Sequence, residues 1–306
     1  MTKQLLAEVF GFPSENLDKK ATRFRKNKLC PFHNRVPSCT KNSATDPLGV
    51  CSIFHEEKPV ITCPIRFTED WLITEAAANF FFPSEVIENG MWTSLREIRL
   101  KDRNGKSAGN IDYVLVSYDR DGKILDFGAL EVQAVYISGN VTKPFKTFMN
   151  DPGFQSSKSA QNRFHPRPDF LSSSRKRLAP QLVYKGGILT SWGKKLAVVL
   201  QKCFYETMPK LPEVESRIDA DVAWFIYDLE LNNDLNRYEL QMANKILTKF
   251  QPALDELLTP EPGPVEEFVG KLQTKLENEL SGASPEAPVL TDILTSVHPE
   301  TPPRRF

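Results

Sequence analysis

The chain has 306 residues, and its 39 Lys and Arg balance 39 Asp and Glu, so its formal net charge is zero. No stretch approaches the roughly 18 consecutive apolar residues that a membrane helix needs, and the N-terminus carries no signal-type apolar run. We therefore expect a cytoplasmic protein with no membrane contact, built as a core domain with appendages.

The zero net charge hides an uneven distribution along the chain. Residues 1–66 carry 11 basic and 6 acidic side chains, residues 140–202 carry 12 and 2, and residues 251–306 carry 4 and 10. A basic excess of this size can neutralise phosphates, although an ordinary solvated surface is the alternative. We expect residues 140–202 to contact nucleic acid.

Four of the five cysteines fall within residues 1–66, which we expect to form an N-terminal metal-binding module. Cys30, Cys39, Cys51 and Cys63 follow the spacing C-x8-C-x11-C-x11-C, which differs from the paired C-x2-C of common zinc fingers. Four thiolates would close a tetrahedral structural site, and Fe and Zn suit it equally. Four free cysteines are the alternative.

Residues 67–250 are expected to form the core domain. A helix should begin at Thr68 and end at Pro83, and a strand should follow over Ser94–Lys101. Two further strands, I-D-Y-V-L-V-S-Y and F-G-A-L-E-V-Q-A-V-Y, are joined by an Asp-Arg-Asp-Gly turn that predicts an antiparallel hairpin.

Polar side chains interrupt the two apolar strands of this hairpin. Because strand side chains alternate, Glu131 and Gln133 should share one face, with Leu130, Val132 and Ala134 on the other. Asp112 lies on the preceding strand, and two carboxylates suffice to hold Mg²⁺, which keeps several waters. The pattern indicates a Mg²⁺ site for cutting phosphodiesters. The alternative is an ion pair between Glu131 and a basic residue of the Ser94–Lys101 strand.

Residues 138–172 are rich in loop-forming residues, and a helix is expected over about Ser174–Thr190. Two further strands, Ala197–Tyr205 and Val222–Leu231, would complete a mixed sheet of about five strands flanked by helices, an α/β core. Six basic residues of this region are candidates for DNA contacts: Arg163, Arg167, Arg175, Lys176, Arg177 and Lys185.

Residues 251–306 form the third expected part, a C-terminal helix with a flexible tail. Eight prolines fall in residues 260–306, and between them Pro264 begins an amphipathic helix. Its apolar stripe would pack on the core or on a second subunit. Residues 281–306 are expected to be loose.

Taken together, these segments resemble a known family. Asp112 and the Glu131-Val132-Gln133 run resemble the PD-(D/E)xK nuclease core, with Gln133 at the usual lysine position. The four-cysteine segment ahead of it resembles the NotI-type restriction endonucleases. The run R-L-A-P-Q-L-V-Y-K-G-G-I-L-T-S-W-G-K-K is also similar to that family.

The resemblance implies a type II restriction endonuclease, a homodimer that hydrolyses double-stranded DNA with Mg²⁺ and leaves 5′-phosphates. Asp112 and Glu131 would bind Mg²⁺, and Glu97 would be an additional carboxylate that either binds the metal itself or lies beside its ligands. The four cysteines would hold a structural iron, with zinc as the alternative, and a companion DNA methyltransferase would be expected. Two alternatives are open, a metal-stabilised DNA-binding protein without chemistry and a nuclease of repair or defence without strict sequence specificity.

Overall fold

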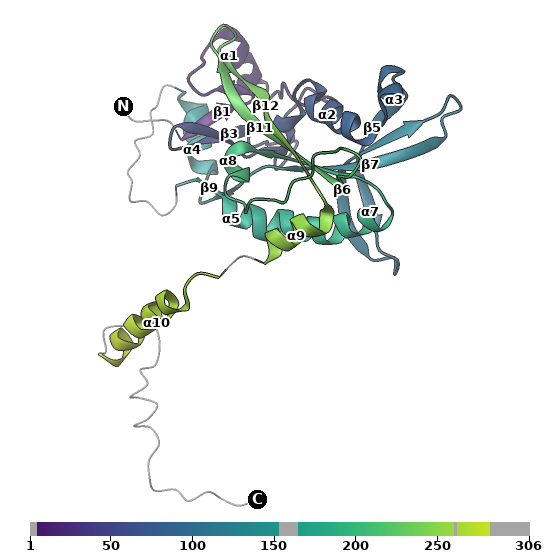
Figure 1. Ribbon diagram of the computed structural model, residues 1–306. Helices are drawn as coiled ribbons and strands as arrows, with labels where there is room; N and C mark the ends of the chain where they lie inside the picture. The colour runs from purple at the N-terminus through teal and green to yellow at the C-terminus, as the bar shows by residue number, and fades with distance from the viewer. Residues whose placement is uncertain (1–4, 153–164, 260–261, 282–306) are drawn as a thin grey trace, which may run out of the picture. The chain divides into compact units, whose positions relative to one another are not determined.

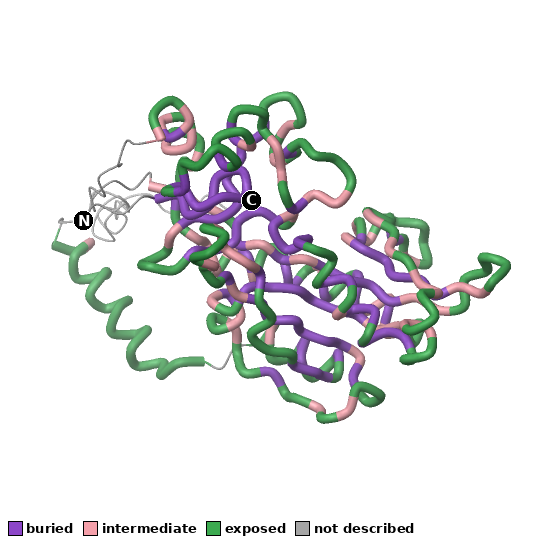
Figure 2. The backbone as a smooth tube through the Cα atoms, turned by 90° about the horizontal axis from the view of Figure 1, so that it is seen from above, coloured by how far each residue is buried: buried purple, intermediate pink, exposed green. Residues whose placement is uncertain are grey.

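The computed structural model describes residues 5–152, 165–259 and 262–281 of the chain. Residues Met1–Leu258 form one compact unit, and a second unit starts at Thr259. The described part of the second unit contains helix α10 (Val265–Leu280), whose side chains are almost all exposed (Figure 2). No helix among the described residues is both long and apolar enough to cross a membrane.

A six-stranded mixed sheet forms the centre of the first unit (Figure 1). Its strands stand in the order β12-β11-β10-β7-β6-β5. Strands β5, β6 and β7 form an antiparallel meander, β10 is parallel to both β7 and β11, and β12 closes the far edge antiparallel to β11. The bounds are β5 Trp92–Lys101, β6 Ser107–Tyr118, β7 Ile124–Gln133, β10 Leu196–Gln201, β11 Val222–Asn232 and β12 Arg237–Thr248.

The expected mixed sheet flanked by helices is confirmed, with one strand more than expected. The additional strand, β12, is an edge strand whose residues 241–245 are exposed, so its apolar residues do not form one continuous run. The strand expected over Ala197–Tyr205 ends at Gln201 and turns into the short helix α8 (Lys202–Tyr205). Strand β7 ends at Gln133, and β8 (Tyr136–Ser138) then pairs with β9 (Arg167–Asp169) in a separate ribbon.

Helices cover both faces of the sheet. Helix α2 (Leu72–Phe81) packs on one face with Leu115, Leu130 and Val199, and α3 (Ser84–Glu88) follows it. Gly128 permits the close approach of α2, because a Cβ there would lie 2.4 Å from the Phe81 ring. The helix expected from Thr68 begins only at Leu72, after the 3₁₀ turn η1 (Pro64–Trp71).

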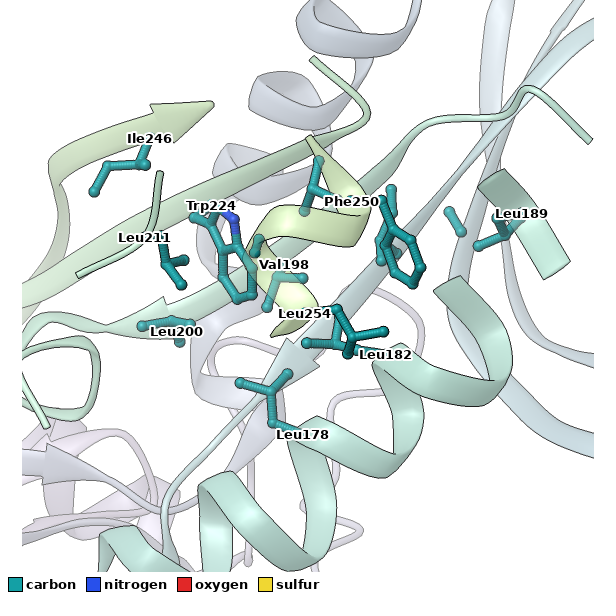
Figure 3. Packing of buried hydrophobic residues seen from close by; sticks show 14 of the residues in the cluster. Leu178, Leu182, Leu189, Val198, Leu200, Leu211, Trp224, Ile246, Phe250 and Leu254 are labelled. Atoms are coloured by element: carbon teal, nitrogen blue, oxygen red, sulfur yellow. The ribbon is translucent and has the colours of Figure 1, made fainter. Parts of the chain in front are cut away.

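A long helix covers the opposite face and runs without interruption from Phe170 to Ser191. It contains two π-helical turns, η2 (Ser174–Leu178) and η3 (Leu182–Gly186), between the α-helical segments α5 (Phe170–Ser173), α6 (Ala179–Gln181) and α7 (Gly187–Ser191). Pro180 has no N–H for the regular helical hydrogen bond, which accounts for the irregular winding around it. Leu178, Leu182 and Leu189 point from this helix into a core shared with β10, β11 and α9 (Phe250–Leu258), as Figure 3 shows.

The N-terminal residues form a second, antiparallel sheet with the strand order β2-β1-β3-β4. Its strands are β1 Leu6–Val9, β2 Phe12–Pro13, β3 Val50–His55 and β4 Lys58–Ile61, and helix α1 is Lys19–Lys26. The sheet has a hydrophobic cluster of its own, which Phe148 of α4 (Thr142–Asn150) completes. This cluster draws on residues more than 80 positions further along the chain.

A buried ionic network ties the small sheet to the large one. The fully buried guanidinium of Arg66 donates to Glu8 of β1 at 3.0 Å, to Glu69 at 2.8 Å and to the Tyr238 carbonyl of β12 at 2.9 Å. Glu69 also accepts from the Leu240 amide at 2.9 Å. The backbone angles of Glu69 are not helical, so Glu69 is not part of a regular helix. Its carboxylate belongs to this ionic network instead.

Candidate active site

The hairpin of β6 and β7 brings Asp112 and Glu131 together. Tyr113 pairs with Leu130, and the next position along this antiparallel register sets Asp112 opposite Glu131. The ladder of β6 and β7 ends here, and the Val132 amide donates to the Asp112 carboxylate at 2.8 Å. The alternation expected for β7 holds, since Leu130 and Val132 pack with the α2 face while Ala129 packs with the long helix.

Glu97 lies across from Asp112 on the neighbouring strand. Arg96 pairs with Tyr113 and Ile98 with Ile111, so Glu97 stands opposite Asp112 in the register. Its φ of 54° is left-handed, which is a strained conformation for a residue with a side chain, and such strain occurs at functional sites. The exposed Glu97 carboxylate is close enough for its charge to raise the pKa of Asp112.

Glu131 forms a buried ion pair with Lys185 of η3. The Lys185 ammonium donates to the two Glu131 oxygens at 2.8 and 2.7 Å and to the Asn110 carbonyl at 2.6 Å. Glu131 and Lys185 are only 2% and 4% exposed. The sequence suggests Mg²⁺ or a basic residue of the Ser94–Lys101 strand as the partner of Glu131, and it places Lys185 among the candidates for DNA contacts.

Burial and mutual repulsion perturb both carboxylates. Burial, followed by the charge of Asp112, raises the pKa of Glu131 from 4.5 to about 8, although Lys185 opposes this shift. Burial also raises the pKa of Asp112, against the hydrogen bond from Val132 and the charge of Lys185. The raised pKa values show that two negative charges are unfavourable here, and a bound cation would compensate them.

Gln133 follows Glu131 on the same face of β7 and is 7% exposed. Its side-chain amide donates to the neighbouring Ala134 carbonyl at 2.7 Å, so it brings hydrogen-bonding capacity but no charge to this face. The only cationic side chain that the described residues place in hydrogen-bond contact with Glu131 is therefore that of Lys185.

The donors fit a Mg²⁺ ion of the kind that keeps most of its waters. Asp112 and Glu131 offer carboxylate oxygens, which are the ligands that Mg²⁺ prefers, and one or two such groups are enough. Within the described part of the chain, no group of three or more His, Cys, Asp or Glu side chains is arranged to hold a metal ion. Mg²⁺ binding here stays a prediction.

The four N-terminal cysteines surround one small cavity. Cys30, Cys39, Cys51 and Cys63 all line it, together with Lys41 and Arg66. All four are free thiols, and burial raises the pKa of Cys30 to about 12 and also raises those of Cys39 and Cys51. Sulfur ligands facing one space suit a metal, but the described side chains are not closed around one, so the metal stays a prediction.

The basic candidates that the structure describes, other than Lys185, lie in β9 and η2. Arg167 is in β9, and Arg175, Lys176 and Arg177 are in η2, all with exposed side chains. Arg177 stacks over the Tyr136 ring of β8 at 4.5 Å. Arg163 lies outside the described residues.

A second basic surface was not identified from the sequence. The turn between β5 and β6 and the face of η3 and α7 line an open groove of about 660 Å³. Lys101, Arg103 and Lys106 line one side, and Tyr184 and Trp192, which are 65% and 53% exposed, line the other. Basic residues in the K-D-R-N-G-K turn were the available signal, but only the fold sets them beside exposed aromatic rings. We call this feature the hairpin groove.

Comparison with known proteins identifies the class. A family model described as restriction endonuclease NotI matches residues 15–240, which is more than half of the chain. The match defines a class, the restriction endonucleases. More particularly, the chain belongs to the NotI restriction endonuclease family. A search among curated proteins found no match.

Proposed function

We propose that this protein is a type II restriction endonuclease of the PD-(D/E)xK kind. It would hydrolyse phosphodiester bonds of double-stranded DNA at a specific site, with Mg²⁺, and leave 5′-phosphates. The observation that carries the proposal is the facing pair of Asp112 and Glu131 within a chain of the NotI family. Two exposed basic surfaces, at β9 with η2 and at the hairpin groove, are available to the DNA backbone.

Each polar side chain of the site would have a separate role in hydrolysis. Asp112 and Glu131 would hold the cation, and Glu97 would add a third carboxylate from β5. A bound Mg²⁺ would polarise the scissile phosphoryl group and lower the pKa of a coordinated water. Gln133 can accept from a water or donate to a phosphate oxygen, but it cannot take up a proton at neutral pH.

Three further features belong to the proposal. The four cysteines would hold a structural iron, with zinc as the alternative, in the cavity that they line. The enzyme would act as a homodimer, since a palindromic site is cut on both strands by two copies related by two-fold symmetry. A companion DNA methyltransferase would protect the host DNA.

Purified protein with Mg²⁺ should cut unmethylated DNA of varied sequence into discrete fragments. Asp112→Asn and Glu131→Gln should lower the cleavage rate at least about 1,000-fold, because several kcal/mol of charge stabilisation leave with the cation. Both variants should still bind DNA in a mobility-shift assay. Asp112→Asn keeps an oxygen that can accept from the Val132 amide, so the hairpin should stay intact.

A matched control is Asp126→Asn. Asp126 lies on the same strand β7, but its partner is the partly exposed Lys194 at 2.6 Å, away from the pair. This variant should cut like the wild type. A smear of products would indicate a nuclease without sequence preference, and folded, DNA-binding protein that cuts no unmethylated DNA would indicate a binding protein.

A further inference from the structure

Lys185 occupies a position where the helix otherwise presents leucine. Leu178, Leu182, Lys185 and Leu189 follow a spacing of four, three and four residues, which places them along one side of a helix. The three leucines belong to the buried core in Figure 3. A lysine in such a stripe is expensive to bury unless its charge is compensated.

The backbone around Lys185 leaves space for its side chain. A Cβ at Gly109 would lie 3.3 Å from the Lys185 Cε, and Gly109 has a φ of 105°, which favours glycine. The helix is wound as a π turn over Leu182–Gly186, which contains Lys185, and such turns are frequent at functional sites. A hydrophobic residue of similar volume would fill the space at no electrostatic cost, and a structural ion pair is generally no more stable than that replacement.

Lys185 also supplies a positive charge that no side chain of β7 supplies next to Glu131. Gln133, on the same face of β7 as Glu131, is neutral, whereas the Lys185 ammonium reaches the Glu131 oxygens from a helix 54 residues further along the chain. The ammonium has three hydrogens for donation and already lies within 2.8 Å of a carboxylate of the proposed cleavage site.

We infer that Lys185 is the cationic catalytic residue of this site, supplied by the long helix in place of strand β7. This inference rests on the proposed function. During hydrolysis the water oxygen bonds to phosphorus, the bond from phosphorus to the 3′ oxygen breaks, and the released protons pass to solvent and to that oxygen. Lys185 takes no part in proton transfer. Its ammonium turns from Glu131 toward a non-bridging phosphate oxygen and donates to it as negative charge develops.

The principal test is Lys185→Met, measured beside the wild type with Mg²⁺ and a cleavable DNA. The cleavage rate should fall about 100- to 1,000-fold, as for loss of one preorganised donor. Mg²⁺ affinity, measured by calorimetry on DNA-free protein, should stay equal or rise, because a cation that competes for Glu131 is gone. Lys194→Met is the matched control: its ion pair with Asp126 lies outside the site, and its cleavage rate should not change.

Two further variants separate a catalytic from a structural role. Lys185→Arg keeps the charge and the ion pair, so it should fold if Lys185→Met does not, and it should retain part of the activity. The double variant Gln133→Lys/Lys185→Met returns a cation to the same face from β7 and should regain at least 10-fold of the lost rate. An unfolding midpoint recorded for each variant shows which are folded.

The outcomes are distinct for the two proposals. Wild-type protein that cuts no DNA overturns the proposed function and this inference with it. Wild-type protein that cuts, together with a folded Lys185→Met variant that cuts within a few-fold of it, overturns this inference alone. An unfolded Lys185→Met variant with a folded double variant that stays inactive also overturns it, since the lysine would then serve structure only.

Discussion

At the scale of single residues, the candidate site is a cluster of the partly buried Asp112 carboxylate, the buried Glu131 carboxylate and the buried Lys185 ammonium. Asp112 and Glu131 repel each other across the end of a β ladder, and Lys185 compensates part of their charge. Ionising both carboxyl groups without a bound cation is unfavourable, and their oxygens could bind one. The stability of the protein should therefore depend on the protonation of this cluster, and so on pH.

The pH dependence has a definite sign. The pKa of Glu131 is about 8 in the folded protein against an ordinary 4.5, so between these values the folded state keeps a proton that the unfolded state has lost. The free energy of unfolding of metal-free protein should then fall as pH rises from about 5 to about 8. Glu131→Gln should remove this part of the pH dependence, as measured by urea unfolding at the two pH values.

Asp126→Asn is the control for this measurement and should keep the wild-type dependence. Asp126 lies on the same strand in a partly exposed ion pair, and its substitution leaves the buried carboxylates unchanged. Equal pH dependence in the wild type and in Glu131→Gln would contradict the perturbed titration of Glu131.

The sequence predicts the strand residues of this cluster better than the helix residue. Alternation in A-L-E-V-Q-A and the Asp-Gly turn were enough to place Glu131 and Gln133 on one face and Asp112 on the adjacent strand. The facing register and the left-handed Glu97 required the structure. Lys185 was identified only as a basic residue, because its partner Glu131 lies 54 residues away on a different element.

At the scale of elements, the meander of β5, β6 and β7 does two things. Its base sets the carboxylates against the long helix, and its β5–β6 turn carries three exposed basic residues along the hairpin groove. The turn itself is fixed by Asp102, whose carboxylate accepts from the amides of Asn104 and Lys106, both at 2.8 Å. A rigid basic turn beside exposed aromatic rings suits the DNA backbone.

We expect DNA binding to weaken when the turn is stripped of its charge. Replacing Lys101, Arg103 and Lys106 together with Ala should make the slope of log affinity on log salt less negative by about 0.9 for each phosphate that is no longer neutralised, about 2 to 3 in all. The same triple change at Lys19, Lys20 and Lys26, which are exposed on α1, is the control. Equal slopes for both triple variants would show that the hairpin groove does not bind the DNA backbone.

The predicted element boundaries were wrong where tertiary contacts or exposure masked the sequence pattern. The predicted helix at Thr68 begins four residues late because Glu69 is held by Arg66, Leu240 and Arg237 of the buried network. Strand β12 escaped notice because a run of exposed residues separates its buried Leu240 from its buried last residues. Helix α10, in contrast, follows its amphipathic pattern closely and begins at Val265, directly after Pro264.

At the scale of the whole molecule, the N-terminal sheet and the central sheet are parts of one compact unit. The Arg66 network joins β1 to β12 of the central sheet. The Gln201 side chain of β10 accepts from the Ile61 amide at 2.7 Å and donates to the Pro59 carbonyl at 2.8 Å, which joins β4 to the same sheet. A metal in the cysteine cavity would therefore stabilise the same unit that carries the candidate active site.

Elemental analysis of purified protein should find one Fe or Zn per chain, and oxidised iron would give visible absorbance. Cys51→Ser should lose the metal and lower the melting temperature, because the remaining buried thiols would lack their shared cation. Cys203 lies outside the cavity, so Cys203→Ser should keep the metal and the wild-type melting temperature. A metal ratio near zero in folded wild-type protein would contradict the four-cysteine site.

The proposal of a site-specific nuclease is tested most directly by sequencing the DNA ends that the protein produces with Mg²⁺ from a large unmethylated genome. We predict ends that share one short sequence, carry 5′-phosphates and disappear with Asp112→Asn. Ends spread evenly over all sequences would contradict sequence specificity. Ends that persist with Asp112→Asn at the wild-type rate would contradict the assignment of the site.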